Sequence, residues 1–244
     1  MIDYKTETQK KMLTWWKSPL GQSVIEQEKK ALQSLSSHFY GNYQFQMGLA
    51  QKLLPEVPRS AMQKIMARSA DIEGNNELLP FKCHCLDTLL LVHVLEFSSD
   101  PHQVLREAER VLVADGILVL CCFNPWSLWG LKRLFSWQDK PPWHGHFFSL
   151  ARTKDWLALL NFDVIAAERL VFQPPLASAK WIKRLMPMDR WGKRLWPKLA
   201  GVTILVATKR TIPLTPITQN WRAKNIFPPR QLVSKPATRD KSNG

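Results

Sequence analysis

The middle of the chain contains two apolar runs joined by an amphipathic segment. The first run, residues 86–92, does not alternate in polarity, which is typical of a strand covered on both faces of a parallel sheet. The second run, residues 117–123, begins directly after Gly116. Between the runs, Asp100 and Pro101 suit the start of a helix. Apolar residues then recur at helical spacing: Val104, Leu105, Ala108, Val111 and Leu112. The pattern predicts a β-α-β unit.

Weaker patterns on both sides extend this α/β prediction. The predicted helices are residues 7–39 with a break at 18–21, then 127–135 and 153–160. The predicted strands are residues 43–49, which alternate in polarity, 62–67, 162–167 and 202–207, and an irregularity would extend the third of them to 171. We expect the last two strands to be partners. The sequence therefore predicts one α/β domain with additions.

Ligands of open parallel sheets bind beyond the carboxyl ends of the strands. Leu91, Val92 and His93 stand at the end of the first apolar run. Phe123 and Asn124 stand at the end of the second run, with Trp126 shortly after. These residues are therefore the first candidates for a binding site.

Several segments resemble a known family. They are Leu79-Pro80-Phe81, HVLEF at 93–97, DPHQVLREAERVL at 100–112 and NPWSLWG at 124–130. Together they resemble class I S-adenosylmethionine-dependent methyltransferases of the methyltransferase type 11 group, and most of all a small proteobacterial subfamily often encoded beside glyoxalase genes. The core of the resemblance is residues 79–131, and a weaker form extends over about 15–216. It implies a Rossmann-like, mainly parallel sheet with an antiparallel last strand, and S-adenosyl-L-methionine as cofactor.

The resemblance also implies a cofactor pocket, but the chain departs from the family there. Only Gly48, followed by Leu49, stands where the family has two or three glycines. The residue that closes the second strand is not acidic, so Asp71 is the nearest substitute for the carboxylate that holds the ribose. Only 30 residues separate Gly48 from Leu79, which is too few for two full crossovers. We therefore expect a shortened N-terminal half.

The remaining predicted contacts follow the same resemblance. Asn75, followed by Asn76, stands where the family has an aspartate near the adenine amino group, although Asn75 with Gly74 also suits a simple turn. Leu91, Val92 and His93 are expected against the cofactor. His93 is the candidate acid or base, and the alternative is a packed, hydrogen-bonded histidine.

The residues expected near the methyl acceptor start at the end of the second apolar run. The resemblance places Phe123, Asn124 and Trp126 towards the methyl acceptor. Asn124-Pro125-Trp126 invites comparison with the Asn/Asp-Pro-Pro-aromatic motif of amino-group methyltransferases, but it lacks the second proline and follows a different strand. We interpret it as a turn that starts a helix. The aromatic residues that follow, up to Phe148, are expected to form a lid over the acceptor.

The charge of the chain points to a further kind of partner. The formal net charge is +14, which favours polyanionic partners such as RNA or an anionic membrane surface. Residues 180–198 contain seven Lys or Arg and one Asp, with three tryptophans between them. This segment suits single-stranded RNA, an anionic membrane or packing on the sheet edge. Pro187 and Gly192 predict that it is not one continuous helix.

We expect the chain to consist of three segments. Residues 1–40 form a helical cap, and residues 41–212 form the methyltransferase-like domain with aromatic-basic insertions near 126–150 and 176–200. Residues 213–244 form a disordered basic tail, either a solubilising extension or a nucleic-acid contact. The N-terminus lacks an apolar signal core, and no apolar run reaches the length of about 18 residues that spans a membrane, so we expect a cytoplasmic protein.

The cysteines, two near the start of the first run and two inside the second, are expected to be small buried apolar residues and not metal ligands. The function that the resemblance implies is methyl transfer from S-adenosylmethionine to an acceptor that the sequence does not identify. The alternative is a non-catalytic protein of the same fold that binds nucleic acid, an anionic membrane surface or a protein partner. The single glycine after the first strand and the missing ribose carboxylate favour this alternative.

Overall fold

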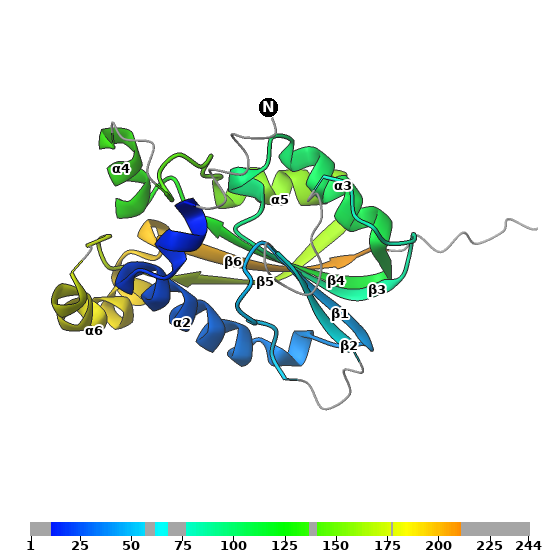
Figure 1. Ribbon diagram of the computed structural model, residues 1–244, viewed down its shortest axis with the longest axis horizontal. Helices are drawn as coiled ribbons and strands as arrows, with labels where there is room; N and C mark the ends of the chain where they lie inside the picture. The colour runs from blue at the N-terminus through cyan, green and yellow to red at the C-terminus, as the bar shows by residue number, and fades with distance from the viewer. Residues whose placement is uncertain (1–10, 57–61, 68–76, 137–140, 177, 211–244) are drawn as a thin grey trace, which may run out of the picture. The chain divides into compact units, whose positions relative to one another are not determined.

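The structure is a computed structural model, and it describes residues 11–56, 62–67, 77–136, 141–176 and 178–210. The chain divides into the compact units Met1–Thr211 and Ile212–Gly244, and every element below belongs to the first (Figure 1). Its strands are β1 (Tyr43–Met47), β2 (Met62–Met66), β3 (Leu86–Val92), β4 (Leu112–Phe123), β5 (Phe162–Leu170) and β6 (Val202–Lys209). Its helices are α2 (Pro19–Ser34), α3 (Pro101–Val111), α4 (Leu128–Phe135), α5 (Leu150–Leu159) and α6 (Ala179–Leu195). Short 3₁₀ turns are η1 (Ser36–His38), η2 (Leu95–Phe97) and η3 (Pro197–Leu199).

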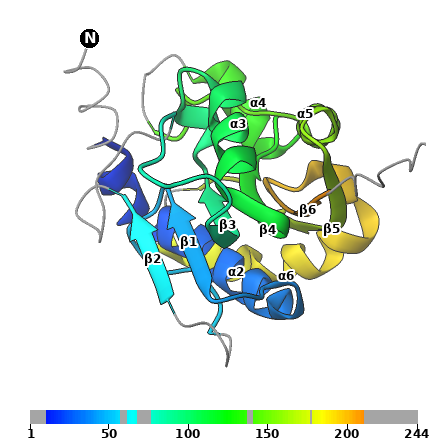
Figure 2. The same cartoon turned by 90° about the vertical axis from the view of Figure 1, so that its right-hand side faces the viewer.

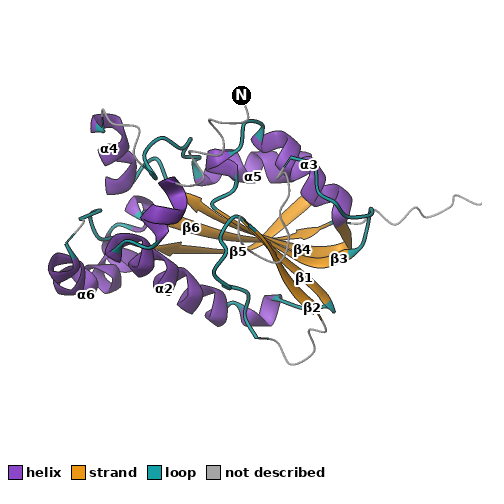
Figure 3. Ribbon diagram, in the orientation of Figure 1, coloured by secondary structure: helices purple, strands orange, loops and turns teal. Residues whose placement is uncertain are grey.

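The described strands form one sheet of six in the order β2-β1-β3-β4-β6-β5 (Figure 3). Strands β2, β1, β3 and β4 are parallel to one another. Strand β6 is antiparallel to both β4 and β5. The predicted fold class, a mainly parallel sheet with an antiparallel last strand, is confirmed, and so is the pairing of the last two strands. The predicted irregularity also exists, because the register of β5 shifts between Val164 and Ala166.

The β-α-β unit predicted in the middle of the chain is β3, α3 and β4. Asp100 caps α3, since its Oδ1 accepts a hydrogen bond from the backbone N–H of Gln103 at 2.9 Å. Pro101 is the first residue of the helix. The apolar face of α3 is buried on the sheet, including Val104, Leu105, Ala108 and Val111. Cap, proline and periodicity therefore act together, as the sequence indicated.

The connections between the first three strands are short. In the described parts of the connections from β1 to β2 and from β2 to β3, there is no helix. The two connections lie within residues 48–61 and 67–85, of which 57–61 and 68–76 lie outside the described residues. Strands β1, β2 and β3 are nonetheless parallel.

Helices cover both faces of the sheet. Figures 1 and 2 show α2 and α6 on one side and α3 and α5 on the other. Successive residues of β3 point to opposite faces, so Leu90 and Val92 join the core under α2, whereas Leu89 and Leu91 join the core under α3 and α5. Strand β3 is therefore covered on both faces, as its lack of alternation in polarity predicted.

Strand β1 does not follow its apparent alternation. Gln44 and Gln46 alternate with apolar residues in the sequence, yet both are buried. Gln44 Oε1 accepts a hydrogen bond from Gln63 Nε2 at 2.9 Å, so its polar group is paired inside the protein. The polar face of β1 is thus an internal hydrogen-bonding face and not a solvent face.

The prediction that Pro187 and Gly192 interrupt the segment 180–198 is wrong, because α6 continues through both positions. Pro187 removes a single N–H donor from the helix. Gly192 is required by packing: a Cβ atom there would lie 2.4 Å from Phe172 Cγ. The glycine therefore brings the helix close to the domain instead of breaking it.

The cysteines differ from expectation on one point. Cys121 and Cys122 are buried in β4, but Cys83 is exposed and Cys85 half-buried, because both precede β3 in a turn. Among the described residues, no group of three or more His, Cys, Asp or Glu is placed to hold a metal ion. No described helix is both long enough and apolar enough to cross a membrane. The expected cap, domain and tail boundaries stay a prediction.

Candidate functional site

The carboxyl ends of β1 and β3 meet at Gly48. Its φ is +99°, a conformation that favours glycine, and the residue is exposed. A Cβ atom at this position would lie 2.2 Å from the backbone oxygen of Val92. Gly48 and Val92, both predicted to contact the cofactor, are therefore direct neighbours. Leu49 is buried in the core under α2, whereas Leu91 is buried on the opposite face of the sheet.

Gln46 organises the loop that follows β1. Its Nε2 donates to the backbone oxygens of Leu49 and Gln51 at 2.8 and 2.7 Å. Its Oε1 accepts from the backbone N–H groups of Leu53 and Leu54 at 2.8 and 3.2 Å. One buried side chain thus fixes the loop at the position where class I methyltransferases have a glycine-rich turn. Sequence reasoning missed this role, and its only signal was a long amide side chain two residues before Gly48.

His93 forms the polar centre of the site. It is a buried residue with φ of +51°, a conformation that is uncommon outside glycine. Its Nδ1 lies 2.9 Å from Glu96 Oε1 and its Nε2 lies 2.7 Å from Glu28 Oε1. Glu28 comes from α2, and both glutamates are buried. The same Glu96 oxygen, Oε1, also accepts a hydrogen bond from the backbone N–H of Phe123, the last residue of β4, at 2.7 Å.

The two carboxyl groups determine the charge of His93. Burial lowers its pKa, but the charges of Glu28 and Glu96 and their hydrogen bonds outweigh burial and raise the pKa to about 10. The imidazole is therefore protonated at neutral pH and donates through both nitrogens. In this state His93 has no lone pair with which to act as a general base. Glu28 Oε2 and Glu96 Oε2 are buried and have no hydrogen-bond partner among the described residues.

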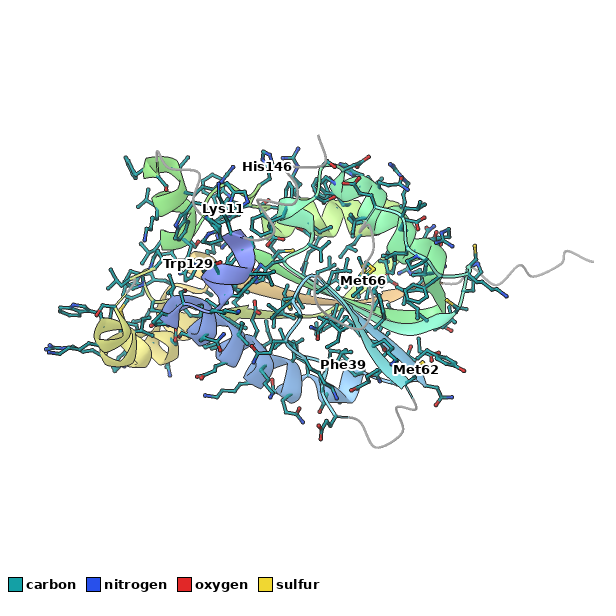
Figure 4. All side chains as sticks on the ribbon, in the orientation of Figure 1. Lys11, Phe39, Met62, Met66, Trp129 and His146 are labelled. Carbon is teal, nitrogen blue, oxygen red and sulfur yellow. The ribbon has the colours of Figure 1, made fainter. Side chains whose placement is uncertain are left out.

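Aromatic rings surround this cluster. The ring of Phe123 stacks on His93 with 4.0 Å between ring centroids, and it also stacks on Trp129 and Phe147 at 5.6 and 5.1 Å. Trp15, in the helical residues 11–16, contacts both Phe123 and Trp129 edge to face. Figure 4 shows Trp129 beside the helical segment that begins at Lys11. The site is thus closed on this side by the N-terminal helical residues and the start of α4.

Asn124 and Trp126, the other predicted acceptor residues, lie at the edge of the site. Asn124 Nδ2 donates to the backbone oxygens of Lys198 and Ala200 at 3.0 and 2.9 Å. Its Oδ1 accepts from the N–H of Trp126 at 3.1 Å. The Trp126 side chain is 73% exposed. The turn that was predicted to start a helix here is present before α4, and the amide of Asn124 also joins it to the connection before β6.

The structure thus brings together five of the predicted site residues: Gly48, Leu49, Val92, His93 and Phe123. Asp71, Asn75 and Asn76 lie outside the described residues, so their roles stay predictions. The residues that sequence reasoning missed are Glu28 and Gln46. Glu28 is 65 positions from His93, and no local pattern connects them.

Comparison with known proteins agrees with this geometry. Residues 43–120 match the family model described as a methyltransferase domain. The chain is 38% identical over 166 residues to the uncharacterized protein YafS of Escherichia coli strain K12, a match that covers 66% of this chain and 60% of YafS. It is 28% identical over 119 residues to malonyl-[acyl-carrier protein] O-methyltransferase of Laribacter hongkongensis, covering 48% of this chain and 40% of that enzyme. The chain therefore spans about 60% of the length of YafS.

A solved structure shows the same fold. A SAM-dependent methyltransferase of Thermotoga maritima, described as a possible histamine N-methyltransferase, superposes with a TM-score of 0.53 at 17% identity, over 76% of this chain and 89% of that chain. Residues 43–120 therefore match a methyltransferase domain, and the sheet has the fold of a SAM-dependent methyltransferase. The cofactor that such a domain indicates is S-adenosylmethionine.

Proposed function

We propose that this protein is a cytoplasmic methyltransferase that transfers the methyl group of S-adenosylmethionine to an acceptor. The observation that carries the proposal is the meeting of Gly48 with Val92 at the carboxyl ends of β1 and β3, inside the segment that matches the methyltransferase domain. Ligands of this sheet architecture bind at such strand ends. The four cysteines are free thiols, which supports a reducing compartment.

The residues present fit the cofactor. Gly48 is exposed and has no side chain, so a ligand can approach the backbone closely. The buried cluster of two carboxyl groups and one protonated histidine carries a net negative charge, which favours the positive charges of the cofactor's sulfonium and amino groups. We assign Gly48, Leu49, Val92 and His93 to this contact. When bound, the cofactor supplies an electrophilic methyl group.

The chain's own residues would orient the reactants. Transfer of a methyl group requires mainly that the nucleophile, the methyl carbon and the leaving sulfur are aligned. His93, held from both sides by Glu28 and Glu96, supplies a fixed charged cluster and not a proton acceptor. Phe123 stacks on this cluster and extends its contact to Trp129. We therefore propose a site that works by positioning and leaves deprotonation of the acceptor to the acceptor's own chemistry.

A matched pair of glycine variants tests the assignment. Gly48 and Gly41 both have positive φ, +99° and +90°, and a Cβ atom at either would lie within 2.2 Å of another atom. Gly48 is at the carboxyl end of β1, whereas Gly41 precedes its amino end. Gly48→Ala and Gly41→Ala are therefore expected to lose comparable stability. Only Gly48→Ala is expected to lose the thermal shift that S-adenosylmethionine produces in the unsubstituted protein.

The same thermal-shift measurement on the unsubstituted protein does not depend on whether a variant folds. A thermal shift with S-adenosylmethionine supports the methyltransferase proposal. The absence of any shift at millimolar cofactor contradicts it, and the non-catalytic alternative then becomes the better account of the fold. A shift that survives Gly48→Ala unchanged contradicts the assignment of Gly48 alone.

A further inference from the structure

Helix α4 carries its apolar side chains on the outside. Leu128, Leu131, Leu134 and Phe135 expose between 36% and 77% of their surface and recur at helical spacing. The basic residues of α4 reach back to the domain, although Lys132 is itself exposed and Arg133 half-buried. Lys132 Nζ donates to the backbone oxygen of Pro175 at 2.8 Å, and Arg133 Nε donates to that of Trp143 at 3.2 Å. Surface helices normally show the opposite arrangement, so α4 presents an apolar stripe to solvent.

Helix α6 and the turn after it expose a second set of large apolar residues. These are Trp181, Trp191, Leu195, Trp196 and Leu199, each between 43% and 66% exposed. Exposed basic residues lie among them: Lys180, Arg184, Lys193, Arg194 and Lys198. The opposite face of the helix contains the buried Ile182 and Gly192, which pack on the domain. The helix is therefore fixed to the domain by one face and exposes tryptophan and cationic groups on the other.

The two helices lie at the same end of the domain and share their supports. Both lie at the left in Figure 1, α4 above the level of the sheet and α6 below it. The connection from β5 to α6 holds both of them. Trp129 Nε1 of α4 donates to the backbone oxygen of Gln173 at 3.1 Å, and Asp189 Oδ1 of α6 accepts from the N–H of Phe172 at 2.7 Å. The exposed residues of α4, Trp126 and the outer face of α6 with η3 are called the aromatic-basic surface below.

The composition of this surface identifies its partner. Residues 180–198 contain seven Lys or Arg and one acidic residue, so the partner is anionic. Single-stranded RNA would use the tryptophan rings for stacking, but it gives no role to the exposed leucines. A lipid bilayer uses both, because leucine and phenylalanine enter the acyl boundary while tryptophan, lysine and arginine occupy the headgroup level.

We propose that the aromatic-basic surface is a peripheral docking site for an anionic membrane surface. Helix α4 supplies the apolar contact, and α6 with η3 supplies the interfacial tryptophans and the cations. This inference goes beyond the proposed enzymatic function and does not depend on it. Cofactor binding and membrane binding are separate measurements, so either can fail without the other.

Vesicle binding by the full-length chain tests the apolar contact. The probes are vesicles of phosphatidylcholine alone and vesicles of phosphatidylcholine mixed with phosphatidylglycerol, and binding is measured by co-sedimentation. Leu134 and Phe135 are 77% and 72% exposed, so the double variant Leu134→Ser, Phe135→Ser is expected to fold normally, as circular dichroism will show. It is expected to lower the partition coefficient on anionic vesicles by about tenfold or more. The matched control is Leu78→Ser, Leu159→Ser, whose leucines are 69% and 80% exposed elsewhere, and it is expected to bind like the unsubstituted protein.

A second pair of variants tests the cationic contact. Lys180→Glu with Arg194→Glu changes two exposed charges of α6, and Lys29→Glu with Lys30→Glu changes two exposed charges of α2. Each lysine or arginine close to an anionic membrane contributes about fivefold to binding, so the α6 variant is expected to lose far more than the α2 variant.

Three results would overturn the proposal. The first is the absence of binding to anionic vesicles. The second is unchanged binding after Leu134→Ser, Phe135→Ser, because the net charge of the chain alone would then account for the association. The third is binding of a labelled single-stranded oligonucleotide without binding of vesicles, which would assign the surface to nucleic acid.

Discussion

Replacement of His93 by asparagine changes the charge of the buried cluster while it preserves the backbone requirement. Asparagine tolerates the left-handed conformation that His93 adopts at φ +51°. The substitution leaves Glu28 and Glu96 buried without the cation between them. Removal of one partner from a buried ion pair costs about 3–5 kcal/mol. We therefore expect His93→Asn to lower the free energy of unfolding at pH 7 by that amount.

The pH dependence gives a sharper expectation. The pKa of His93 is raised from 6.5 to about 10, so its stabilising contribution is complete below pH 6.5 and is lost as the pH rises towards 10. Between pH 6.5 and pH 8.5 the linked loss is about 2 kcal/mol. This loss depends little on the folded-state value, because that value lies above the window. Burial and the charges of Glu28 and Glu96 also raise the pKa of Cys121 and Cys122. The thiols of the unfolded chain titrate near about pH 8.5, so they add to the loss only at the upper end of the window.

The assay is urea denaturation followed by circular dichroism at several pH values in this window. The unsubstituted protein is expected to lose about 2 kcal/mol of unfolding free energy across the window. In His93→Asn the paired carboxyl groups must take up protons, so the loss is expected to begin at lower pH. His146→Gln changes an exposed histidine outside the cluster and is expected to retain the original profile. A flat profile in the unsubstituted protein, or unchanged stability in His93→Asn, would refute the reasoning.

Three further substitutions test the supports of the site, each by urea denaturation. Gln46→Met keeps the volume but removes the four hydrogen bonds to the loop after β1, so a loss of about 3 kcal/mol is expected, and the exposed Gln33→Met serves as its control. Asn124→Ala removes the hydrogen bonds to Lys198, Ala200 and Trp126 and is expected to cost about 2 kcal/mol; a neutral result would mean that these bonds do not hold η3. Glu107 accepts a hydrogen bond from the N–H of Leu79, and its bond to Arg110 is the main cause of its lowered pKa. Its contribution to the free energy of unfolding is therefore present above its unfolded pKa of about 4.5 and is lost as the pH falls through its folded pKa. Glu107→Gln is expected to cost about 1 kcal/mol at pH 7 and to flatten this acid dependence, and an unchanged acid limb would contradict the assignment.

The centre of the fold was predictable because its signals are local. The cap at Asp100, the helical spacing behind it and the apolar run of β3 all act within one β-α-β unit. The partner of β6 was predictable as well, since strong β-branched strands near the end of such a domain have few alternatives. The continuity of α6 was not, because the close approach of Gly192 to Phe172 is a tertiary contact.

The site was only partly predictable for the same reason. His93 could be proposed because it stands at a strand end, and Gly48 because the family resemblance places glycine after the first strand. Glu28, the partner of His93 on α2, could not be found, since in the sequence it resembles any charged residue of an amphipathic helix. Gln46 was missed because a polar residue in an alternating strand normally faces solvent, whereas here the loop after β1 covers it.

Isothermal titration of the full chain with S-adenosylmethionine and with S-adenosylhomocysteine tests the central claim most directly. The account predicts saturable binding of either ligand with a dissociation constant in the micromolar range. Binding would show that one glycine and the loop fixed by Gln46 suffice where the family has a glycine-rich turn. The absence of heat for both ligands at millimolar concentration would contradict the claim and leave a methyltransferase fold without its cofactor.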